Sequence, residues 1–246
     1  MPVLASIHLG KCAGNAFANL LIREVSPQMP VLVFYGQGHP ATGLWQNRIR
    51  EPINAEGSSL KEICGPLLER TGGTFLVHGH IKAREYLEFL PQNCQFFTWL
   101  RHPLQRICSH YYYWKNQGLK PPQRPEGRPL FEGVVRGDCS LVEFGRHPLI
   151  AEYYTAMLDP LGLDGLALAG VTEHSQPSLV RLSALLGVEL PSGMRMVNQT
   201  RSKPAKVYDL TPDEELQLLA WNSKDMHLYN RALARLTDHS QRSAVC

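Results

Sequence analysis

The stretch "SIHLGKCAGNAF", residues 6–17, follows a short apolar run and precedes a segment with helical periodicity. It places Lys11 between Gly10 and Gly14, where the chain is predicted to turn from a strand into a helix. At such a turn the first helical N–H groups lack intrahelical partners, and the positive end of the helix dipole faces the ligand side. The stretch therefore predicts a phosphate-binding turn. The alternative is an ordinary glycine turn with a solvated lysine.

The turn differs from the loop that binds nucleoside triphosphates, whose pattern is G-x-x-x-x-G-K-[ST]. Here Cys12 follows Lys11, so the hydroxyl that would hold magnesium is missing, and Ala5 stands where the first glycine is required. A P-loop kinase acting on a small molecule is therefore the least favoured of the functions considered.

Beyond this turn, short apolar runs alternate with segments of helical periodicity. Continuous apolar strands separated by helices favour a parallel sheet that is covered on both faces. We therefore predict an α/β fold, a P-loop-like three-layer sandwich with a central parallel sheet flanked by helices, formed as one domain over residues 1–246. The predicted strands are 3–8, 31–35, 74–80, 94–100 and 166–171, and the predicted helices are 15–25, 58–70, one from Pro103, 175–187, 211–222 and 225–236.

One stretch breaks the alternation. Residues 117–138, "QGLKPPQRPEGRPLFEGVVRGD", hold four prolines and are predicted to form a long loop, either a mobile lid or a substrate-facing insert. Five basic and two acidic side chains between residues 115 and 136 give a local excess of +3. This excess favours an anionic acceptor, such as a glycan that bears uronate, or, equally, a basic loop whose charges are simply solvated.

Composition limits the class of protein. The chain has 246 residues, 43% of them hydrophobic, which is enough for a sizeable core. Its net charge of +3 tolerates an anionic ligand but argues against a nucleic-acid partner. No apolar run approaches the ~18 residues of a membrane span, and no signal-peptide pattern opens the chain. The six cysteines form no C-x-x-C pair, so we expect reduced thiols in a cytoplasmic protein. The sequence gives no indication of oligomeric state.

A second cluster follows a predicted central strand, in "FFTWLRHPLQRICSHYYYW", residues 96–114. Arg101 lies where the strand leaves the sheet, and Ser109 lies about two turns into a helix that is expected to start at Pro103. A guanidinium with a hydroxyl suits a phosphate monoester. A salt bridge at the helix end is the simpler explanation for Arg101 alone, and Arg106 is expected to be a solvated helix residue rather than an assisting one.

Together with "VHGHI", residues 77–81, these two stretches resemble the PAPS-dependent sulfotransferases, most closely the heparan/uronyl 2-O-sulfotransferase-like branch. In that family a turn of the P-K-x-A/G-G-T type holds the 5′-phosphosulfate of PAPS. A segment like R-D/N-P-x-x-R-x-x-S-x-Y holds the 3′-phosphate, and an H-G-H segment supplies the catalytic base. The order and approximate spacing match over residues 6–115. Residues 169–187 resemble the family's later strand–helix unit, and "NQTRSKP", residues 198–204, resembles the C-terminal loop that closes on the nucleotide.

The resemblance implies a role for each matched residue. Lys11 would neutralise charge on the oxygen that leaves during sulfuryl transfer, and His80, or else His78, would be the base. PAPS would be the donor and PAP the product, no metal would be needed, and the acceptor would be a hydroxyl of a saccharide or another small alcohol. The 3′-phosphate would be held by Arg101 and Ser109, with Arg201 and Lys203 as further phosphate contacts, and the 5′-phosphate by Gly10, Lys11, Cys12, Ala13, Gly14, Asn15, Ala16 and Phe17.

The histidine pair has a chemical reason of its own. Histidine is the side chain whose pKa lies nearest neutrality, so it suits removal of a proton from an acceptor hydroxyl. Residues two apart on a strand point to one face, and Gly79 between His78 and His80 is expected to leave the sheet edge open to a ligand. Without the flanking motifs, a structural histidine or a zinc-binding pair would be the better explanation.

The chain also departs from the family pattern. Gly10 stands where the family has proline, Asn15 and Ala16 replace a pair of hydroxyl residues, and His102 replaces Asp or Asn, a better helix cap. These departures bear on the affinity for the donor rather than on the location of the site. They motivate a second hypothesis, a nucleotide-binding protein of the same fold that has no transfer activity.

Overall fold

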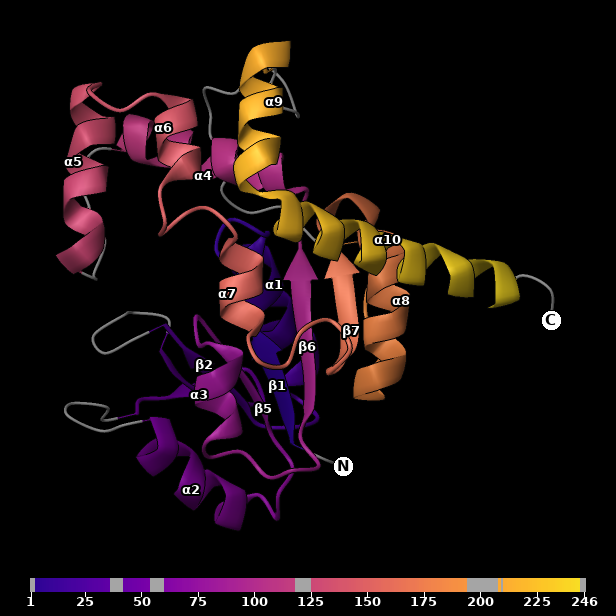
Figure 1. Ribbon diagram of the computed structural model, residues 1–246. Helices are drawn as coiled ribbons and strands as arrows, with labels where there is room; N and C mark the ends of the chain where they lie inside the picture. Colours follow the sequence, from indigo (N-terminus) through magenta and orange to yellow (C-terminus); the bar gives the residue numbers. More distant parts are fainter. Residues whose placement is uncertain are drawn as a thin grey trace.

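The computed structural model describes residues 3–35, 42–53, 60–117, 125–193, 208 and 210–243, with side chains up to residue 238. Within them, seven strands form one mixed sheet in the order β4–β3–β2–β5–β1–β6–β7, which helices cover on both faces (Figure 1). This confirms the predicted three-layer α/β architecture. The strands are β1 (Leu4–Ile7), β2 (Val31–Phe34), β3 (Gly43–Gln46), β4 (Ile49–Glu51), β5 (Leu76–Gly79), β6 (Gln95–Leu100) and β7 (Leu166–Val171).

The five strands β2, β5, β1, β6 and β7 are parallel, so their carboxyl ends share one edge of the sheet. The chain leaves β1 toward β2 and β5 on one side and later crosses to β6 and β7 on the other. Such a reversal of direction opens a crevice at the carboxyl ends of the strands, which is where ligands bind in open α/β sheets. The turn at residues 8–13 follows β1 and therefore lies at this position.

The sheet also has an antiparallel edge, formed by two strands that the sequence analysis did not predict. β3 and β4 pair antiparallel with β2 and with each other. They are joined at Asn47 and Arg48, whose φ angles of 50° and 65° are both in the left-handed region, as a tight two-residue hairpin turn requires. Asn47 suits such a turn, but Arg48 does not, so the sequence carried only half of the usual signal.

Helices pack on both faces of the sheet (Figure 1) and bury one hydrophobic cluster on each face. Alternate strand residues such as Ala5 and Val77 contact one layer, and their neighbours Leu4 and Leu76 contact the other, as the two-residue period of a strand requires. The first layer holds α2 (Leu60–Arg70), α3 (Ala83–Leu87), α7 (Tyr153–Leu158) and α10 (Ser223–Ser243), and the second holds α1 (Gly14–Leu20), its π-helical continuation (Leu21–Val25) and α8 (Ser175–Leu186), which the 3₁₀ turn Thr172–His174 precedes.

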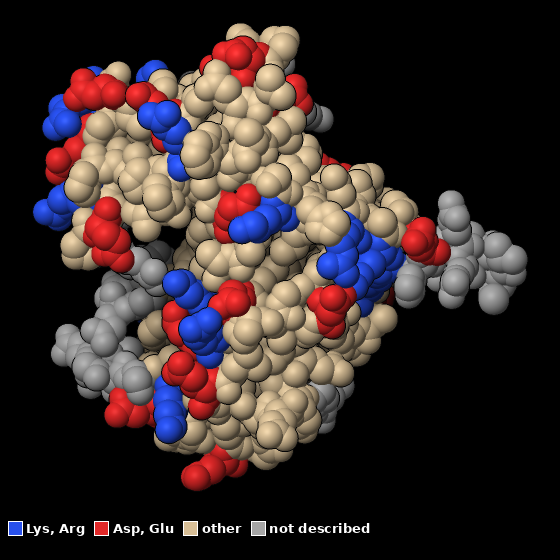
Figure 2. Space-filling model, in the orientation of Figure 1, with Lys and Arg blue, Asp and Glu red and all other residues tan. Residues whose placement is uncertain are grey.

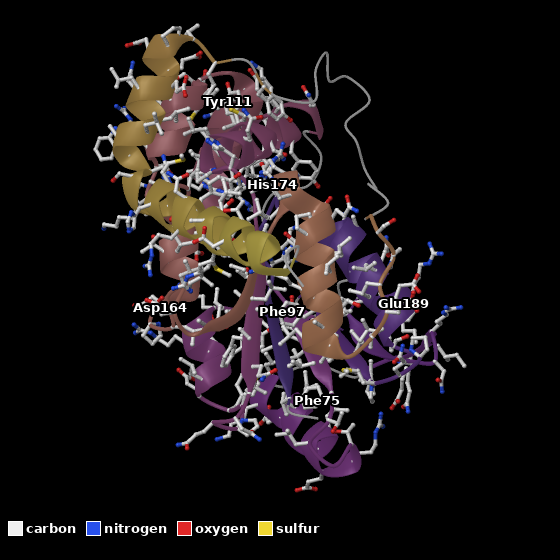
Figure 3. The ribbon with its side chains drawn as sticks, turned by 90° about the vertical axis from the view of Figure 1, so that its right-hand side faces the viewer. Phe75, Phe97, Tyr111, Asp164, His174 and Glu189 are labelled. Carbon is white, nitrogen blue, oxygen red and sulfur yellow. The ribbon has the colours of Figure 1, made fainter. Side chains whose placement is uncertain are left out.

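A helical lobe stands over the carboxyl edge of the sheet (Figure 1). It consists of α4 (Pro103–Gln117), α5 (Arg128–Arg136), α6 (Leu141–Arg146) and α9 (Pro212–Trp221) and has its own buried cluster. Figure 3 places Tyr111 in this lobe and Phe97 in the sheet below. The space-filling view shows a hollow between the lobe and the part of the molecule that contains β2 and α3, with basic and acidic side chains interspersed over the surface (Figure 2).

The predicted loop at 117–138 is largely helical where it is described. Pro125–Gly127 form a 3₁₀ turn that leads into α5, whereas residues 118–124 lie outside the described part. Leu130, Phe131 and Val134 are buried in the lobe, and Gly137, with a φ of 87°, ends the helix in the left-handed conformation. The prolines therefore mark a helix start here rather than an extended loop.

Candidate functional site at the carboxyl edge of the sheet

The turn after β1 has an unusual backbone. Lys11 and Ala13 adopt left-handed conformations, with φ angles of 67° and 61°, while Cys12 between them does not. Non-glycine residues rarely take such angles. Successive residues of alternating hand direct their N–H groups into one concavity, which is a common way of building an anion site. The local conformation thus agrees with the predicted phosphate-binding turn, although neither left-handed residue is a glycine.

Gly14 is required for a different reason. A Cβ atom at this position would lie 1.6 Å from Nε2 of His8, so the glycine makes room for the imidazole ring. Gly10 has no such requirement from its protein neighbours, because a Cβ there would lie 3.5 Å from the Tyr153 hydroxyl, an ordinary contact. The two glycines of the motif therefore differ in their packing: only at Gly14 do close neighbours exclude a side chain.

Several backbone N–H groups in the predicted phosphate-binding turn already have hydrogen-bond partners within the protein. Gly10 N–H donates to the Tyr153 hydroxyl at 3.3 Å, and Cys12 N–H donates to the Leu9 carbonyl at 3.3 Å. Phe17 N–H already bonds within the helix, to the Ala13 carbonyl at 3.0 Å, and its ring packs in the core. Amides at the start of a helix have no partner one turn earlier. The donors best placed for an anion are therefore the first-turn N–H groups, those of Gly14, Asn15 and Ala16.

Lys11 reaches across to the helical lobe. Its Nζ lies 3.5 Å from the centroid of the Tyr113 ring, a cation–π contact. Tyr113 is one helical turn beyond Ser109 on α4, and Ser109 is itself half-buried. The lysine of the first motif and the serine of the second therefore lie at the same end of the sheet, on facing elements.

Three imidazoles stack at this edge. The ring of His8 lies between those of His80 and His78, with centroid distances of 4.0 Å and 4.9 Å. Burial, and then the positive charge that His80 and His78 would carry, hold the pKa of His8 well below its usual range. The lowered pKa keeps the central His8 ring neutral. We did not predict a role for His8 from the sequence, because only the H-G-H pair was considered there.

His78 is built into the protein. Its Nδ1 lies 2.8 Å from the Ser6 hydroxyl and its Nε2 lies 2.9 Å from the Tyr35 hydroxyl, and burial lowers its pKa to about 3. Gly79 does not leave the edge open, because a Cβ there would lie 2.2 Å from the Phe34 carbonyl oxygen of β2. That glycine instead allows β2 to approach β5 closely.

His80 is placed differently. Its side chain is exposed, and its Nδ1 lies 3.0 Å from the His8 carbonyl oxygen. Because a carbonyl can only accept, Nδ1 carries the hydrogen, and Nε2 is the basic nitrogen of the neutral ring. The ring also borders the glycine turn, since its Cε1 would lie 3.9 Å from a Cβ at Gly10.

Arg101 begins the loop between β6 and α4. Its backbone is held on both sides by Tyr154, whose hydroxyl donates to the Arg101 carbonyl at 2.7 Å and accepts from the Arg101 N–H at 3.3 Å. The next amide, His102 N–H, donates to the Glu173 carboxylate at 2.9 Å and so receives an acceptor at the start of α4. The salt bridge considered as an alternative for Arg101 is not found among the described residues.

The second arginine of this motif is in an unexpected place. Arg106, which we expected to be solvated, is only 1% exposed; one of its guanidinium nitrogens donates to the Ile150 carbonyl at 2.7 Å. Its guanidinium carbon also lies 4.8 Å from the centroid of the Tyr153 ring. Helical periodicity alone could not reveal this burial, because the residues that cover Arg106 come from a segment some 45 positions away in sequence.

Nearby positive charges help to lower the pKa of a buried histidine on α4. His110, on the same helix, has a pKa held well below its usual range, first by burial and then by the charges of Arg106, Lys11 and His80. An anion bound beside this helix would be stabilised by the charges of Arg106 and Lys11. Of the other predicted phosphate contacts, Arg201 and Lys203 lie outside the described residues.

Within the described residues, no cluster of three or more His, Cys, Asp or Glu side chains is arranged to hold a metal ion.

Two further features concern the described chain as a whole. The five cysteines in this part form no disulfide, and four of them are buried. None of the described helices combines the length and apolar character needed to span a membrane.

Comparison with known proteins gives the following. No protein-family model matches the chain, and no curated protein matches it. Among solved structures, a sulfotransferase from Alicyclobacillus acidocaldarius is similar at 16% identity and a TM-score of 0.47, covering 96% of each chain. The mouse sulfotransferase SULT7A1 complexed with PAP is similar at 14% identity and a TM-score of 0.46, covering 98% of this chain and 88% of that one. At such distances, any assignment of function rests on the site itself.

Proposed function

We propose that this protein is a PAPS-dependent sulfotransferase, which transfers a sulfuryl group from PAPS to a hydroxyl of a saccharide or another small alcohol-bearing acceptor. One observation carries the proposal. The turns that follow three adjacent strands, β5, β1 and β6, lie at one edge of the sheet and bear His80, Lys11 and Arg101, one from each motif.

The chemistry of these groups fits a doubly phosphorylated donor. Lys11 and Arg101 supply two cationic side chains, and the first-turn amides of α1 supply neutral donors for phosphate oxygens. Glu173 is the acidic group beside Arg101, but its carboxylate accepts the His102 N–H instead. A magnesium nucleotide would need a hydroxyl where Cys12 lies buried, and burial raises the pKa of this thiol to about 11. The residues therefore favour a donor held by cations and amides.

PAPS would supply a sulfuryl group attached to a phosphate leaving group. His80 would take the proton of the acceptor hydroxyl at Nε2, because its hydrogen-bonded Nδ1 fixes the tautomer. Lys11 would meet the negative charge that grows on the leaving oxygen, where an ammonium stabilises the transition state more than the ground state. His78 has both ring nitrogens engaged within the protein, so we assign it a structural role beside the base.

The charges of the described residues bear on the class of acceptor. The positive excess at residues 115–136 suggested an anionic glycan, but Arg136 forms an ion pair with Asp138 at 2.8 Å, just beyond that range. The proposal therefore retains a hydroxyl-bearing small molecule as the acceptor class, with anionic glycans as one group to test.

The test is turnover with labelled PAPS and a panel of saccharide and alcohol acceptors. We expect a product heavier by one sulfuryl group, and we expect Lys11→Ala and His80→Ala to lower kcat by about a hundredfold or more. Matched controls are Lys61→Ala, which removes an exposed lysine on α2, and His227→Ala, which removes an exposed histidine on α10. Both controls should retain wild-type turnover.

Two results would contradict the proposal. Binding of ADP with magnesium but not of adenosine 3′,5′-bisphosphate in calorimetry would favour the kinase alternative. Binding of the bisphosphate without transfer to any acceptor would favour the second hypothesis, a nucleotide-binding protein that has lost transfer activity.

A further inference from the structure

Two consecutive tyrosines at the start of α7 connect the turn that carries Lys11 with the turn that carries Arg101. We propose that Tyr153 and Tyr154 are positioning residues, which hold the two turns at the spacing needed for one ligand to contact both. The inference rests on the proposed function, because it assumes a donor with a phosphate group at each end.

Tyr154 makes the central connection. Its side chain is fully buried, and its hydroxyl both donates to the Arg101 carbonyl at 2.7 Å and accepts from the Arg101 N–H at 3.3 Å. Since its single hydrogen is used, the Cys12 thiol, 3.2 Å away, is the donor in their contact. One hydroxyl therefore bonds to the turn after β1 and to the turn after β6.

Tyr153 adds a second connection. Its hydroxyl accepts the Gly10 N–H at 3.3 Å, one residue before Lys11. The guanidinium of Arg106 lies 4.8 Å from the ring centroid of Tyr153 and 5.5 Å from that of Tyr154, so α4 packs on both rings. The two tyrosines thereby contact the glycine turn through their hydroxyls and the helix that follows Arg101 through their rings.

The position of α7 is itself fixed from another part of the chain. Asp225 of α10 is fully buried, and its carboxylate accepts the N–H of Tyr154 at 2.8 Å and the N–H of Thr155 at 2.9 Å. No side chain within α7 caps this helix, so Asp225 performs that role. The two tyrosines therefore contact both turns from a helix, α7, whose own position α10 fixes.

This arrangement makes a specific prediction about ligands. A nucleotide with phosphates at both ends gains from preorganised spacing, whereas a nucleotide that contacts one turn does not. Tyr154→Phe removes only the hydroxyl. We expect it to weaken binding of adenosine 3′,5′-bisphosphate about five- to tenfold while leaving adenosine 5′-monophosphate and adenosine 3′-monophosphate within about twofold of the wild type.

The experiment is calorimetry with these three nucleotides on the wild type, Tyr154→Phe, Tyr153→Phe and a control, Tyr86→Phe. Tyr86 of α3 is also buried, and its hydroxyl donates to the Ser6 carbonyl of β1 at 3.3 Å, outside both turns. The control variant should bind all three nucleotides as the wild type does. Tyr153→Phe, expected to act in the same direction with a smaller effect, keeps the test valid if Tyr154→Phe fails to fold.

Amide hydrogen exchange on the protein without nucleotide provides a readout that does not depend on ligand. Tyr154→Phe should speed exchange at residues 10–13 and at Arg101, whereas Tyr86→Phe should not. Equal weakening of all three nucleotides, or unchanged bisphosphate binding together with unchanged exchange, would overturn the positioning role. Absence of bisphosphate binding by the wild type would instead reject the proposed function, and with it the inference.

Discussion

At the scale of single residues, the site depends on how deeply each imidazole lies. Strand periodicity placed His78 and His80 on one face, and both rings do lie near His8. Periodicity could not show that Ser6 and Tyr35, from neighbouring strands, occupy both nitrogens of His78. The distinction between a buried ring and an exposed ring therefore required the tertiary structure.

The requirement for Gly14 can be tested directly. Gly14→Ala should destabilise the protein by about 1–3 kcal/mol, because the new methyl group overlaps the His8 ring. Gly65→Ala is the matched control, since a Cβ there would meet nothing within 4 Å and alanine favours a helix by about 0.5–1 kcal/mol. Denaturant unfolding measures both. An unchanged free energy of unfolding for Gly14→Ala would contradict the packing described here.

The neutral histidines predict a sensitivity to acid. Burial lowers the pKa of His78 from its ordinary value of 6.5 to about 3 in the folded protein, so the unfolded chain binds more protons between these limits. The contribution is complete above pH 6.5 and is lost as pH falls toward 3, at up to about 1.4 kcal/mol per pH unit. His78→Gln should therefore show a shallower loss of unfolding free energy between pH 7 and pH 4. An identical slope would contradict a buried neutral His78.

At the scale of elements, most strands and helices could be predicted because their apolar patterns are continuous. The strand predicted at residues 166–171 matches β7, and the helix predicted from Pro103 matches the start of α4. α5 was missed because its prolines dominated the interpretation, although Gly137 offered a helix-end signal. α7 is only six residues long and carries no side-chain cap of its own, so its sequence alone gives little sign of it.

The support of α7 by α10 gives a prediction at this scale. Asp225→Ala should cost about 2–3 kcal/mol in unfolding free energy, because it leaves buried N–H groups without an acceptor. Asp213→Ala is a fair comparison and should cost less than about 1 kcal/mol, since among the described residues the Asp213 carboxylate accepts only from Gln217, on the exposed face of α9. Equal effects in chemical denaturation would argue against tertiary capping of α7.

At the scale of the whole molecule, the order of the parallel strands assembles the site. β1 lies between β5 and β6, so motifs from three distant parts of the chain share one edge. The sequence showed the three motifs and their order along the chain, and in the structure all three lie at this edge. The sequence did not reveal the roles of Arg106, Tyr153 and Tyr154, because these roles arise from contacts between the helical lobe and the sheet that no local pattern encodes.

The most direct measurement is calorimetric binding of adenosine 3′,5′-bisphosphate and adenosine 5′-monophosphate to the wild type and to Arg101→Ala. We predict that the wild type prefers the bisphosphate. Arg101→Ala should lose about tenfold or more in affinity for the bisphosphate, while binding of the monophosphate changes little. An equal loss for both nucleotides, or no preference in the wild type, would contradict the assignment of the two ends of the donor to Lys11 and Arg101.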